Sequence, residues 1–354
     1  RDRSPSRGLG DVYKRQDTFS IESRRYIGNK AKLIDWIMEV IGEEASDAQS
    51  FCDIFAGTAS VANRAIPKYK EVIVNDFLYS NHVIYRGFFA DGAWDKGKLE
   101  ELIATYNQVR AEDIDDNYFS DNYGGKYFGM NLAKIIGYVR QDIENRKGEL
   151  TDKEYNVLLS SLIYSMDRVS NTIGHYEAYI KKPISERSLN MRLIDVRSYP
   201  HVKVCQEDAN RLVRNISADV FYVDPPYNSR QYSRFYHVYE TLIHWDKRPL
   251  YGVAMKPRAE NMSDYCSCRA RDAFADLIDN MHAKYIFVSY NNTYHSKSKS
   301  SRNKITLEEI KEILSQRGET KILEHTHQFF NAGKTDFKDH KEMLFVTKVY
   351  EYEK

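Results

Sequence analysis

Val220-Phe221-Tyr222-Val223-Asp224-Pro225-Pro226-Tyr227 is the stretch of this chain that decides its fold. An apolar run followed at once by a proline turn predicts a buried strand that ends in a rigid corner. The two prolines fix φ and remove two backbone donors, so the carbonyl groups of the corner point outward. In α/β proteins, ligands bind at the carboxyl ends of parallel strands. The stretch therefore predicts a parallel sheet and the edge of that sheet at which a site lies.

The corner has the groups needed to methylate an exocyclic amino group of a base. Asp224 and the carbonyl of Pro225 can accept the two amino hydrogens, which draws the nitrogen toward tetrahedral geometry and aims its lone pair at a methyl donor. Pro226 stiffens the turn, and Tyr227 can stack on the base. Such a transfer needs no covalent intermediate and no metal. The other interpretation is a rigid turn that only ends a strand.

The rest of the chain alternates short apolar runs with helical patterns, which also indicates a parallel sheet. Residues 30–41 carry an apolar helical face, and Thr306 with Glu309 forms a capping-box pair at the start of a last helix. Residues 84–200 also show helical faces and must be an inserted unit, because structureless connections beyond about 15 residues are uncommon. We predict strands at residues 51–55, 71–76, 202–206, 219–224, 285–290, 321–328 and 342–349.

Three motifs in this order resemble those of the Dam-like, or α-group, adenine-N6 DNA methyltransferases. They are Tyr26-Ile27-Gly28-Asn29-Lys30, Asp53-Ile54-Phe55-Ala56-Gly57-Thr58 and the Asp-Pro-Pro-Tyr corner. The resemblance implies a Rossmann-like, seven-stranded α/β sheet that uses S-adenosyl-L-methionine (AdoMet). It places the catalytic domain at residues 17–83 and 201–354, with a mainly helical target-recognition insertion at 84–200. We expect residues 1–16, which show no hydrophobic periodicity, to be a non-native or disordered leader.

The resemblance also implies where the cofactor binds. The small-residue turn after the first strand would carry the methionine portion of AdoMet, and Lys30 would reach its carboxylate. Asp76 ends the second strand, where an acid can accept hydrogen bonds from ribose hydroxyls. Asp208 fits the adenine amino group, although it fits a helix N-cap equally well. NAD is disfavoured because Gly57 lacks GxGxxG spacing. The expected cofactor-binding residues are Tyr26, Gly28, Lys30, Asp53, Phe55, Gly57, Thr58, Asp76, Asp208 and Asp224.

Two polar, aromatic segments are candidates for contact with DNA. Residues 166–176 are turn-rich and predict a loop or hairpin, and residues 228–237 predict either a loop over an extruded base or a partly buried aromatic helix. Basic groups at residues 297–304 and 181–182, and the set Lys247, Arg248, Lys256 and Arg258, are further candidates, although each is more often a solvated face. The expected DNA-binding residues are Arg168, Asn171, Tyr176, Arg230 and Tyr232.

Composition excludes several other classes of protein. The 354 residues are 42% hydrophobic, but no run approaches the roughly 18 apolar residues of a membrane span, and we expect a cytoplasmic location. The formal charge is +1 at pH 7, so contact with nucleic acid must depend on local basic patches. The four cysteines show no CxxC spacing and predict reduced thiols. His325 and His327 lack a further ligand at metal spacing, so no metal is expected.

We therefore predict a site-specific DNA methyltransferase that transfers a methyl group from AdoMet to the 6-amino group of adenine in double-stranded DNA. The resemblance suggests a role in restriction-modification or DNA marking, with a cognate restriction endonuclease as a candidate partner. Two alternatives remain at this point: an RNA adenine methyltransferase, and a catalytically silent DNA-specificity subunit. Cytosine-N4 transfer is less favoured, because enzymes of that subgroup more often carry Ser at the position of Asp224.

Overall fold

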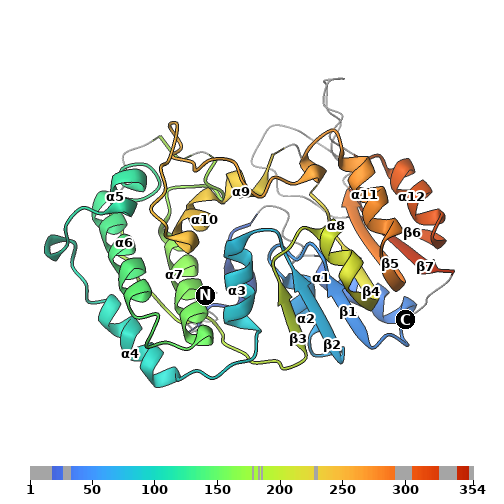
Figure 1. Cartoon of the computed structure of the whole chain (residues 1–354), viewed down its shortest axis with the longest axis horizontal. Coiled ribbons are helices and arrows are strands. Elements are labelled where there is room, and N and C mark those ends of the chain that lie inside the picture. Colours follow the sequence, from blue (N-terminus) through green and yellow to red (C-terminus); the bar gives the residue numbers. More distant parts are fainter. Residues whose placement is uncertain are drawn as a thin grey trace, which may run out of the picture.

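A seven-stranded sheet forms the right-hand half of the molecule in Figure 1. The computed structural model describes residues 18–26, 33–177, 179–181, 184, 186–226, 230–291, 305–326 and 341–350, so residues 1–16 lie outside the described part. The strand order is β3-β2-β1-β4-β5-β7-β6. The strands are β1 (Ser50–Asp53), β2 (Glu71–Asn75), β3 (Val202–Cys205), β4 (Ser217–Val223), β5 (His282–Asn291), β6 (Gly318–Thr326) and β7 (Lys341–Val349).

The pairing of these strands confirms the predicted Rossmann-like, seven-stranded α/β sheet. Strands β3, β2, β1, β4 and β5 pair in parallel, and β7 pairs antiparallel with both β5 and β6. Each predicted run overlaps one strand, with ends shifted by a few residues. The first strand, for example, stops at Asp53, because Ile54 and the residues after it already form the turn at the sheet edge.

Helices cover both faces of the sheet because successive residues of a strand point to opposite sides. Phe51 and Val220 belong to a core cluster with α1 (Ile34–Glu44) and α2 (Ser60–Ala65). The neighbouring residues Cys52 and Phe221 belong to a second cluster with the helices of the other face. Those helices are α8 (Ala209–Leu212), α11 (Ala270–Asp279) and α12 (Leu307–Ser315). The predicted capping box of α12 is confirmed, because the side chains of Thr306 and Glu309 each bond the other's backbone N–H.

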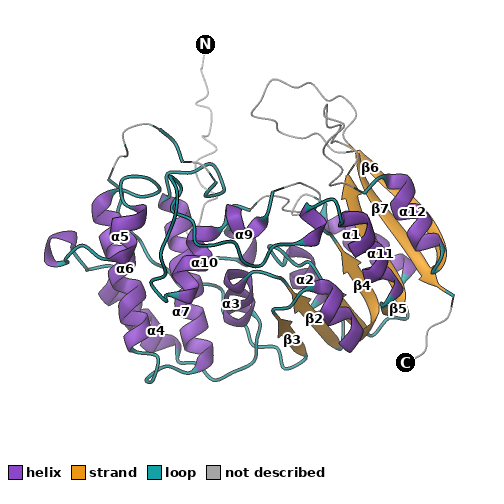
Figure 2. Ribbon diagram, turned by 45° about the horizontal axis from the view of Figure 1, so that its top comes forward, coloured by secondary structure: helices purple, strands orange, loops and turns teal. Residues whose placement is uncertain are grey.

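A helical region lies between β2 and β3 in the chain and beside the sheet in space (Figure 2). Its helices are α3 (Tyr79–Phe88), α4 (Lys96–Tyr106), α5 (Tyr118–Tyr123), α6 (Met130–Asn145) and α7 (Asp152–Val169). Helix α7 is buried along nearly its whole length and packs on α3. The core cluster of α1 continues into α3, α6 and α7, so the helical region and the sheet share one hydrophobic core. That this region recognises the target sequence remains a prediction.

The segment after the corner forms two short helices that join the sheet to the helical region. They are α9 (Tyr232–Phe235) and α10 (His237–His244). Phe235, Tyr236 and His237 are all buried, which matches the partly buried aromatic helix of the two interpretations for residues 228–237. Short 3-10 helices span Ile21–Ser23, Ala111–Asp113, Val213–Asn215 and Asp264–Cys266. Among the described residues, no helix is long and apolar enough to cross a membrane.

A buried acid of α10 caps the amino end of α3. Leu78, the N-cap residue of α3, has no side chain able to satisfy the first backbone donors of the helix. The carboxylate of Glu240 takes that role and accepts hydrogen bonds from the backbone N–H groups of Tyr79 (3.1 Å) and Ser80 (2.9 Å). Burial nevertheless raises the pKa of Glu240 to about 7. A negative charge at this position is therefore only partly compensated, even with the helix dipole nearby.

This pKa predicts how stability depends on pH. The native protein binds a proton at Glu240 more readily than the unfolded chain, so the contribution of this group to stability is largest below about pH 4.5 and is lost as the pH rises through about 7. Between pH 5 and pH 8, the wild type should lose about 2 to 3 kcal/mol of unfolding free energy relative to Glu240→Gln. Urea unfolding of both proteins at the two pH values measures this difference. Equal losses in both proteins would contradict the prediction.

Candidate active site

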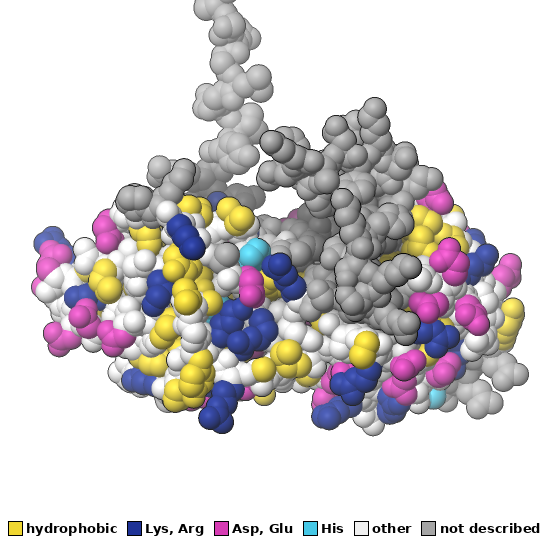
Figure 3. Space-filling view, turned by 90° about the horizontal axis from the view of Figure 1, so that it is seen from above, with side chains coloured by type: hydrophobic (Ala, Val, Ile, Leu, Met, Phe, Trp, Pro, Cys, Tyr) yellow, Lys and Arg dark blue, Asp and Glu magenta, His cyan; other side chains and the backbone are white. Residues whose placement is uncertain are grey.

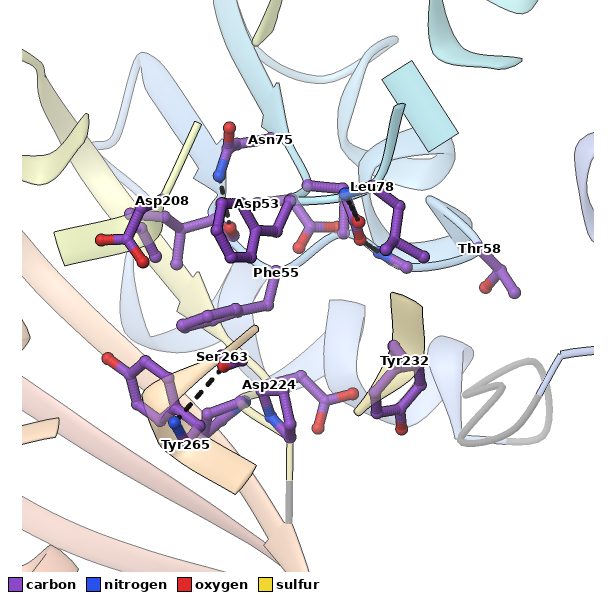
Figure 4. Close-up of a pocket in the computed structure, with 18 of the residues that line it drawn as sticks. Asp53, Phe55, Thr58, Asn75, Leu78, Asp208, Asp224, Tyr232, Ser263 and Tyr265 are labelled. Carbon is purple, nitrogen blue, oxygen red and sulfur yellow. Dashed lines mark hydrogen bonds between the residues drawn. The ribbon is translucent and has the colours of Figure 1, made fainter. Parts of the chain in front are cut away.

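A cavity opens at the carboxyl ends of β1, β2, β3 and β4, where the turns after these strands converge. With its open mouth it has a volume of about 980 Å³, which suits a ligand of several hundred daltons. The ends of the strands and the turns after them supply residues 53–58, 60 and 61, Asn75 to Leu78, Glu207 to Ala209, Tyr222 and Asp224 to Pro226. Tyr26 and residues 231–233, 261, 263 and 265 complete the lining (Figure 4). The parallel sheet thus gathers residues from distant parts of the chain at one edge.

The turn after β1 is open because of the conformation of Gly57. Its φ is +54°, in the left-handed region that favours glycine. A Cβ at this position would lie 3.5 Å from Cε1 of Tyr26, so any side chain would also fill the space beside that ring. The carbonyl of Gly57 accepts a hydrogen bond from the hydroxyl of Tyr85 at 2.7 Å. Tyr85, which does not line the cavity, therefore fixes the turn through this hydrogen bond, and the cavity side of the turn stays accessible to a ligand.

Asp76 connects the turns after β1 and β2. Its Oδ2 accepts a hydrogen bond from the backbone N–H of Gly57 at 3.0 Å, and its Oδ1 accepts one from Leu78 at 2.9 Å. Burial raises the pKa of this carboxyl group above its ordinary value. Each carboxylate oxygen can accept more than one hydrogen bond, so the group can also receive hydroxyl donors from a ligand in the cavity. The geometry is compatible with the expected contact to a ribose.

Asp53 is a buried acid whose charge the surrounding protein leaves uncompensated. The residue is 1% exposed, and Oδ2 accepts a hydrogen bond from the backbone N–H of Ala62 at 3.2 Å. Oδ1 is buried and has no hydrogen-bond partner among the described residues. Burial, and after it the negative charge of Asp224, holds the pKa of Asp53 well above its ordinary value. A buried carboxylate in this condition favours a cationic or hydrogen-bond-donating ligand, and AdoMet, with its sulfonium and ammonium groups, fits this requirement.

The structure gives Asp208 the structural role that the sequence left open, and it also places the residue at the cavity. Asp208 is the N-cap of α8, and its Oδ1 accepts hydrogen bonds from the backbone N–H groups of Asn210 (3.1 Å) and Arg211 (3.2 Å). The same residue lines the cavity. Its contact with the adenine of a cofactor remains a prediction.

Sequence reasoning missed a second wall of the cavity, which comes from the segment after α10. The ring of Tyr265 meets that of Phe55 edge to face, with centroids 5.0 Å apart at 77° (Figure 4). Ser263 and Gln231 are joined by two hydrogen bonds of 2.7 and 2.9 Å, which tie this segment to the residues that follow the corner. Residues 245–266 show no periodic pattern, so no sequence signal could bring Tyr265 to Phe55.

The expected catalytic residues Asp224, Pro225 and Pro226 line the cavity, whereas Tyr227 lies outside the described residues. Gly28 and Lys30, expected at the cofactor, also lie outside them. Tyr232, expected at DNA, lines the same cavity, and its ring stacks on that of Tyr26 at 5.7 Å. The other expected cofactor residues, Tyr26, Asp53, Phe55, Gly57, Thr58, Asp76 and Asp208, are all at the cavity.

The expected DNA contacts have different positions in the structure. Arg168, at the end of α7, and Arg230 are exposed. Asn171 uses its side chain within the fold, because its amide donates to the carbonyls of Lys126 and Ile180. Tyr176 needs a correction: it is 1% exposed, so its buried ring is unavailable to DNA. Its aromatic character serves core packing, with ring centroids 5.0 Å from Tyr239 and 5.4 Å from Tyr127.

Residues 166–176 form the end of α7 and a loop, without the hairpin that was one of two expectations. Two of the basic side chains considered for contact with DNA, Lys256 and Arg248, are engaged in ion pairs. Lys256 contacts Glu177 at 2.7 Å, and Arg248 pairs with both Asp246 and Glu260. In Figure 3, the described part of the face seen from above carries Lys and Arg side chains interspersed with apolar ones. Residues 297–304 and Lys182 lie outside the described residues.

No group of three or more potential metal ligands occurs in the part of the chain that the structure describes. His327, one of the two histidines considered for a metal, lies outside that part. All four cysteines are free; Cys52 and Cys266 are buried, Cys205 is partly buried, and Cys268 is exposed.

The uncompensated charge of Asp53 predicts an effect on stability. Because its folded-state pKa is raised, ionisation of Asp53 at neutral pH destabilises the ligand-free protein. Asp53→Asn keeps an acceptor for the N–H of Ala62 and removes the charge. We expect its melting temperature without ligand at pH 8 to equal or exceed that of the wild type, with a smaller advantage at pH 5. Thermal unfolding at both pH values measures this, and a loss of several degrees at pH 8 would contradict it.

Comparison with known protein families agrees with this geometry. The family model described as D12 class N6 adenine-specific DNA methyltransferase matches residues 26–303. This range begins at Tyr26 and includes the turns after β1 to β4 that form the cavity.

Three curated proteins show the similarity along the chain. Type II methyltransferase M.NlaIII of Neisseria lactamica is 32% identical over 330 residues, which are 89% of this chain and 95% of that protein. Type II methyltransferase M.CviAII of Paramecium bursaria Chlorella virus 1 is 31% identical, over 87% of this chain and 92% of that protein. Type II methyltransferase M.FokI of Planomicrobium okeanokoites is 30% identical over 93% of this chain. The chain spans nearly the whole of the first two proteins and 52% of the third.

Proposed function

The chain belongs to the D12 class of N6 adenine-specific DNA methyltransferases, and we propose that its cavity holds AdoMet against an adenine bound by Asp224 and Pro225. The family and the fold together imply the use of AdoMet. One observation supports the proposed geometry most directly. The buried acids Asp53 and Asp76 and the proline corner that starts at Asp224 line a single cavity at the edge of a parallel sheet.

The proposed cofactor site uses the acids and rings of this cavity. Asp76 would accept the ribose hydroxyls, and the buried Oδ1 of Asp53 would face a positive or donating group of the methionine portion. Phe55 and Tyr265 form the aromatic wall nearest Asp208, which suits an adenine ring. Tyr26 lies against the turn at Gly57. Charge complementarity and aromatic contact thus support the same ligand from two sides of the cavity.

The proposed chemistry at the target depends on Asp224 and its corner. When bound, AdoMet supplies the methyl group of its sulfonium. Asp224 and the Pro225 carbonyl accept the amino hydrogens of adenine, which localises the nitrogen lone pair and orients it for direct transfer. The base must leave the duplex first, at a cost of a few kcal/mol, and stacking on an aromatic ring returns about 1 to 3 kcal/mol. Tyr227 remains the proposed stacking residue.

The biological role follows from the relatives only as a proposal. Three similar proteins are named Type II methyltransferases, which supports a role in restriction-modification or DNA marking. A cognate restriction endonuclease would then act at the same DNA sequence. The family assignment disfavours the RNA methyltransferase and the catalytically silent subunit. We propose that residues 84–200 recognise the target, with the exposed Arg168 and Arg230 as phosphate contacts.

The direct test is to sequence DNA that the purified protein has modified. Unmethylated plasmid DNA is incubated with AdoMet, and modified adenines are located at single-base resolution. We expect N6-methyladenine at one short sequence motif, because direct readout of base edges restricts the enzyme to few sites. Methyl transfer to structured RNA in a parallel reaction, with none to duplex DNA, would refute the proposal.

The role of Asp224 is tested with Asp224→Asn. The neutral amide is a weaker acceptor for its amino hydrogen than the carboxylate and carries no charge, so kcat should fall by a factor of about 10² to 10³ or more. Binding of sinefungin, a nonreactive AdoMet analogue, should weaken much less, because Asp53 and Asp76 remain. Asp272→Asn on the surface of α11, where the side chain is 81% exposed, is the matched control. Turnover by Asp224→Asn equal to that of this control would refute the assigned role.

A further inference from the structure

The end of α7 carries a buried carboxylate that methyl transfer itself does not use. The side chain of Asp167 is 5% exposed. Its Oδ2 accepts hydrogen bonds from the backbone N–H of Arg25 at 3.1 Å and from Nε of the same residue at 3.4 Å. Its Oδ1 accepts one from the hydroxyl of Tyr239 at 2.7 Å. One carboxylate therefore joins the N-terminal segment to α7 and α10, which lie side by side in Figure 1.

A stack of tyrosine rings leads from this carboxylate to the cofactor cavity. The ring of Tyr239 is parallel to that of Tyr236, with centroids 5.9 Å apart at 3°. Tyr236 in turn stacks on Tyr26 at 4.5 Å and 5°, and Tyr26 stacks on Tyr232 at 5.7 Å and 29°. Tyr26 and Tyr232 both line the cavity. Asp167 is thus linked to the Tyr26 ring by two routes, through the adjoining backbone of Arg25 and through the stack.

The guanidinium of Arg25 extends the same network to the loop that follows α7. Nη1 donates to the carbonyl of Thr172 at 3.1 Å, and Nη2 donates to Oγ of Ser170 at 2.7 Å and to the carbonyl of Asp167. The next residue of that loop, Ile173, is 80% exposed, so the loop reaches the surface immediately beside these contacts. Arg25 therefore bonds the loop on one side and precedes the cavity residue Tyr26 on the other.

We propose that Asp167 is a positioning residue that couples the binding of AdoMet to the binding of DNA. This inference rests on the proposed function, because it takes the cavity as the AdoMet site and the loop at residues 170–177 as part of the DNA-facing surface. A ligand that orders Tyr26 also orders Arg25, and Arg25 orders the loop. Each ligand therefore prepares the site of the other, and thermodynamic linkage requires the effect to be equal in both directions.

The test measures this coupling directly with sinefungin and a DNA duplex that carries the methylation motif found by sequencing. Titration calorimetry gives the Kd of sinefungin with and without the duplex, and the Kd of the duplex with and without sinefungin. In the wild type, each ligand should tighten the other by about tenfold, within the usual range of such coupling. In Asp167→Asn, the coupling factor should fall close to one, and sinefungin alone should bind several-fold more weakly.

A matched carboxylate elsewhere in the protein provides the control. Asp142 in α6 also accepts hydrogen bonds from a tyrosine hydroxyl and an arginine Nε, those of Tyr106 at 2.8 Å and Arg146 at 2.6 Å. It has no place in the stack that leads to the cavity. Asp142→Asn should keep the coupling of the wild type. Tyr239→Phe removes only the hydroxyl and keeps the ring stack, so it should fold even if Asp167→Asn does not, and it should lose part of the coupling.

The outcomes separate this inference from the proposed function. A wild-type coupling factor of one would overturn the inference, as would wild-type coupling in Asp167→Asn and Tyr239→Phe. A lower melting temperature with unchanged Kd values would show that Asp167 is purely structural, which also overturns it. If the wild type methylates no adenine in DNA, the proposed function fails. In that case, titration of sinefungin without DNA still tests whether Asp167 positions the residues of the cavity. An unchanged Kd of sinefungin in Asp167→Asn would overturn that part of the inference.

Discussion

The parallel pairing of β4 with β1, and of β1 with β2, is the constraint on which the rest of this structure depends. Because the three strands run in the same direction, the turns that follow them meet at one edge of the sheet. Asp53, Asp76 and Asp224 come from positions far apart in the chain and line one cavity only for that reason. Burial of β4 between β1 and β5 holds the proline corner in place, and helices on both sheet faces keep that burial complete.

The cavity concentrates buried carboxylates whose charge the fold neutralises only in part, because Arg24 acts on Asp76 while no cation of the described residues offsets Asp53. Burial raises the pKa of Asp53 and of Asp76, and the proximity of Asp224 raises that of Asp53 further. Buried acids of this kind reduce the stability of the ligand-free protein, and a cationic ligand offsets that cost. Under the proposed function, the same charge favours the sulfonium of AdoMet over its neutral product. The same carboxylates thus lower the stability of the ligand-free protein and favour a cationic ligand.

Particular residues show how far sequence reasoning reaches. Asp76 and Gly57 were predicted because a strand followed by a small-residue turn or an acid is a local pattern, and both line the cavity. Tyr265 was missed because its contact with Phe55 crosses about 200 residues of chain without any local signal. Tyr176 was misplaced because aromatic residues serve cores and DNA surfaces alike, and only packing against Tyr127 and Tyr239 distinguishes the two. Asp208 had two interpretations, and the N-cap is confirmed by geometry that depends on where α8 begins.

The sequence by itself determined the order of strands and helices, the nature of the sheet and the reaction class, because strand periodicity, turn residues and the Asp-Pro-Pro-Tyr corner are local properties of the chain. Only the tertiary structure decided which side chains share a cavity, which aromatic rings are buried, and how Asp167 joins Arg25 to Tyr239. Those contacts connect residues 72 and 142 positions apart. Their formation depends on the packing of α3 against both α7 and α10, and no local pattern specifies that packing.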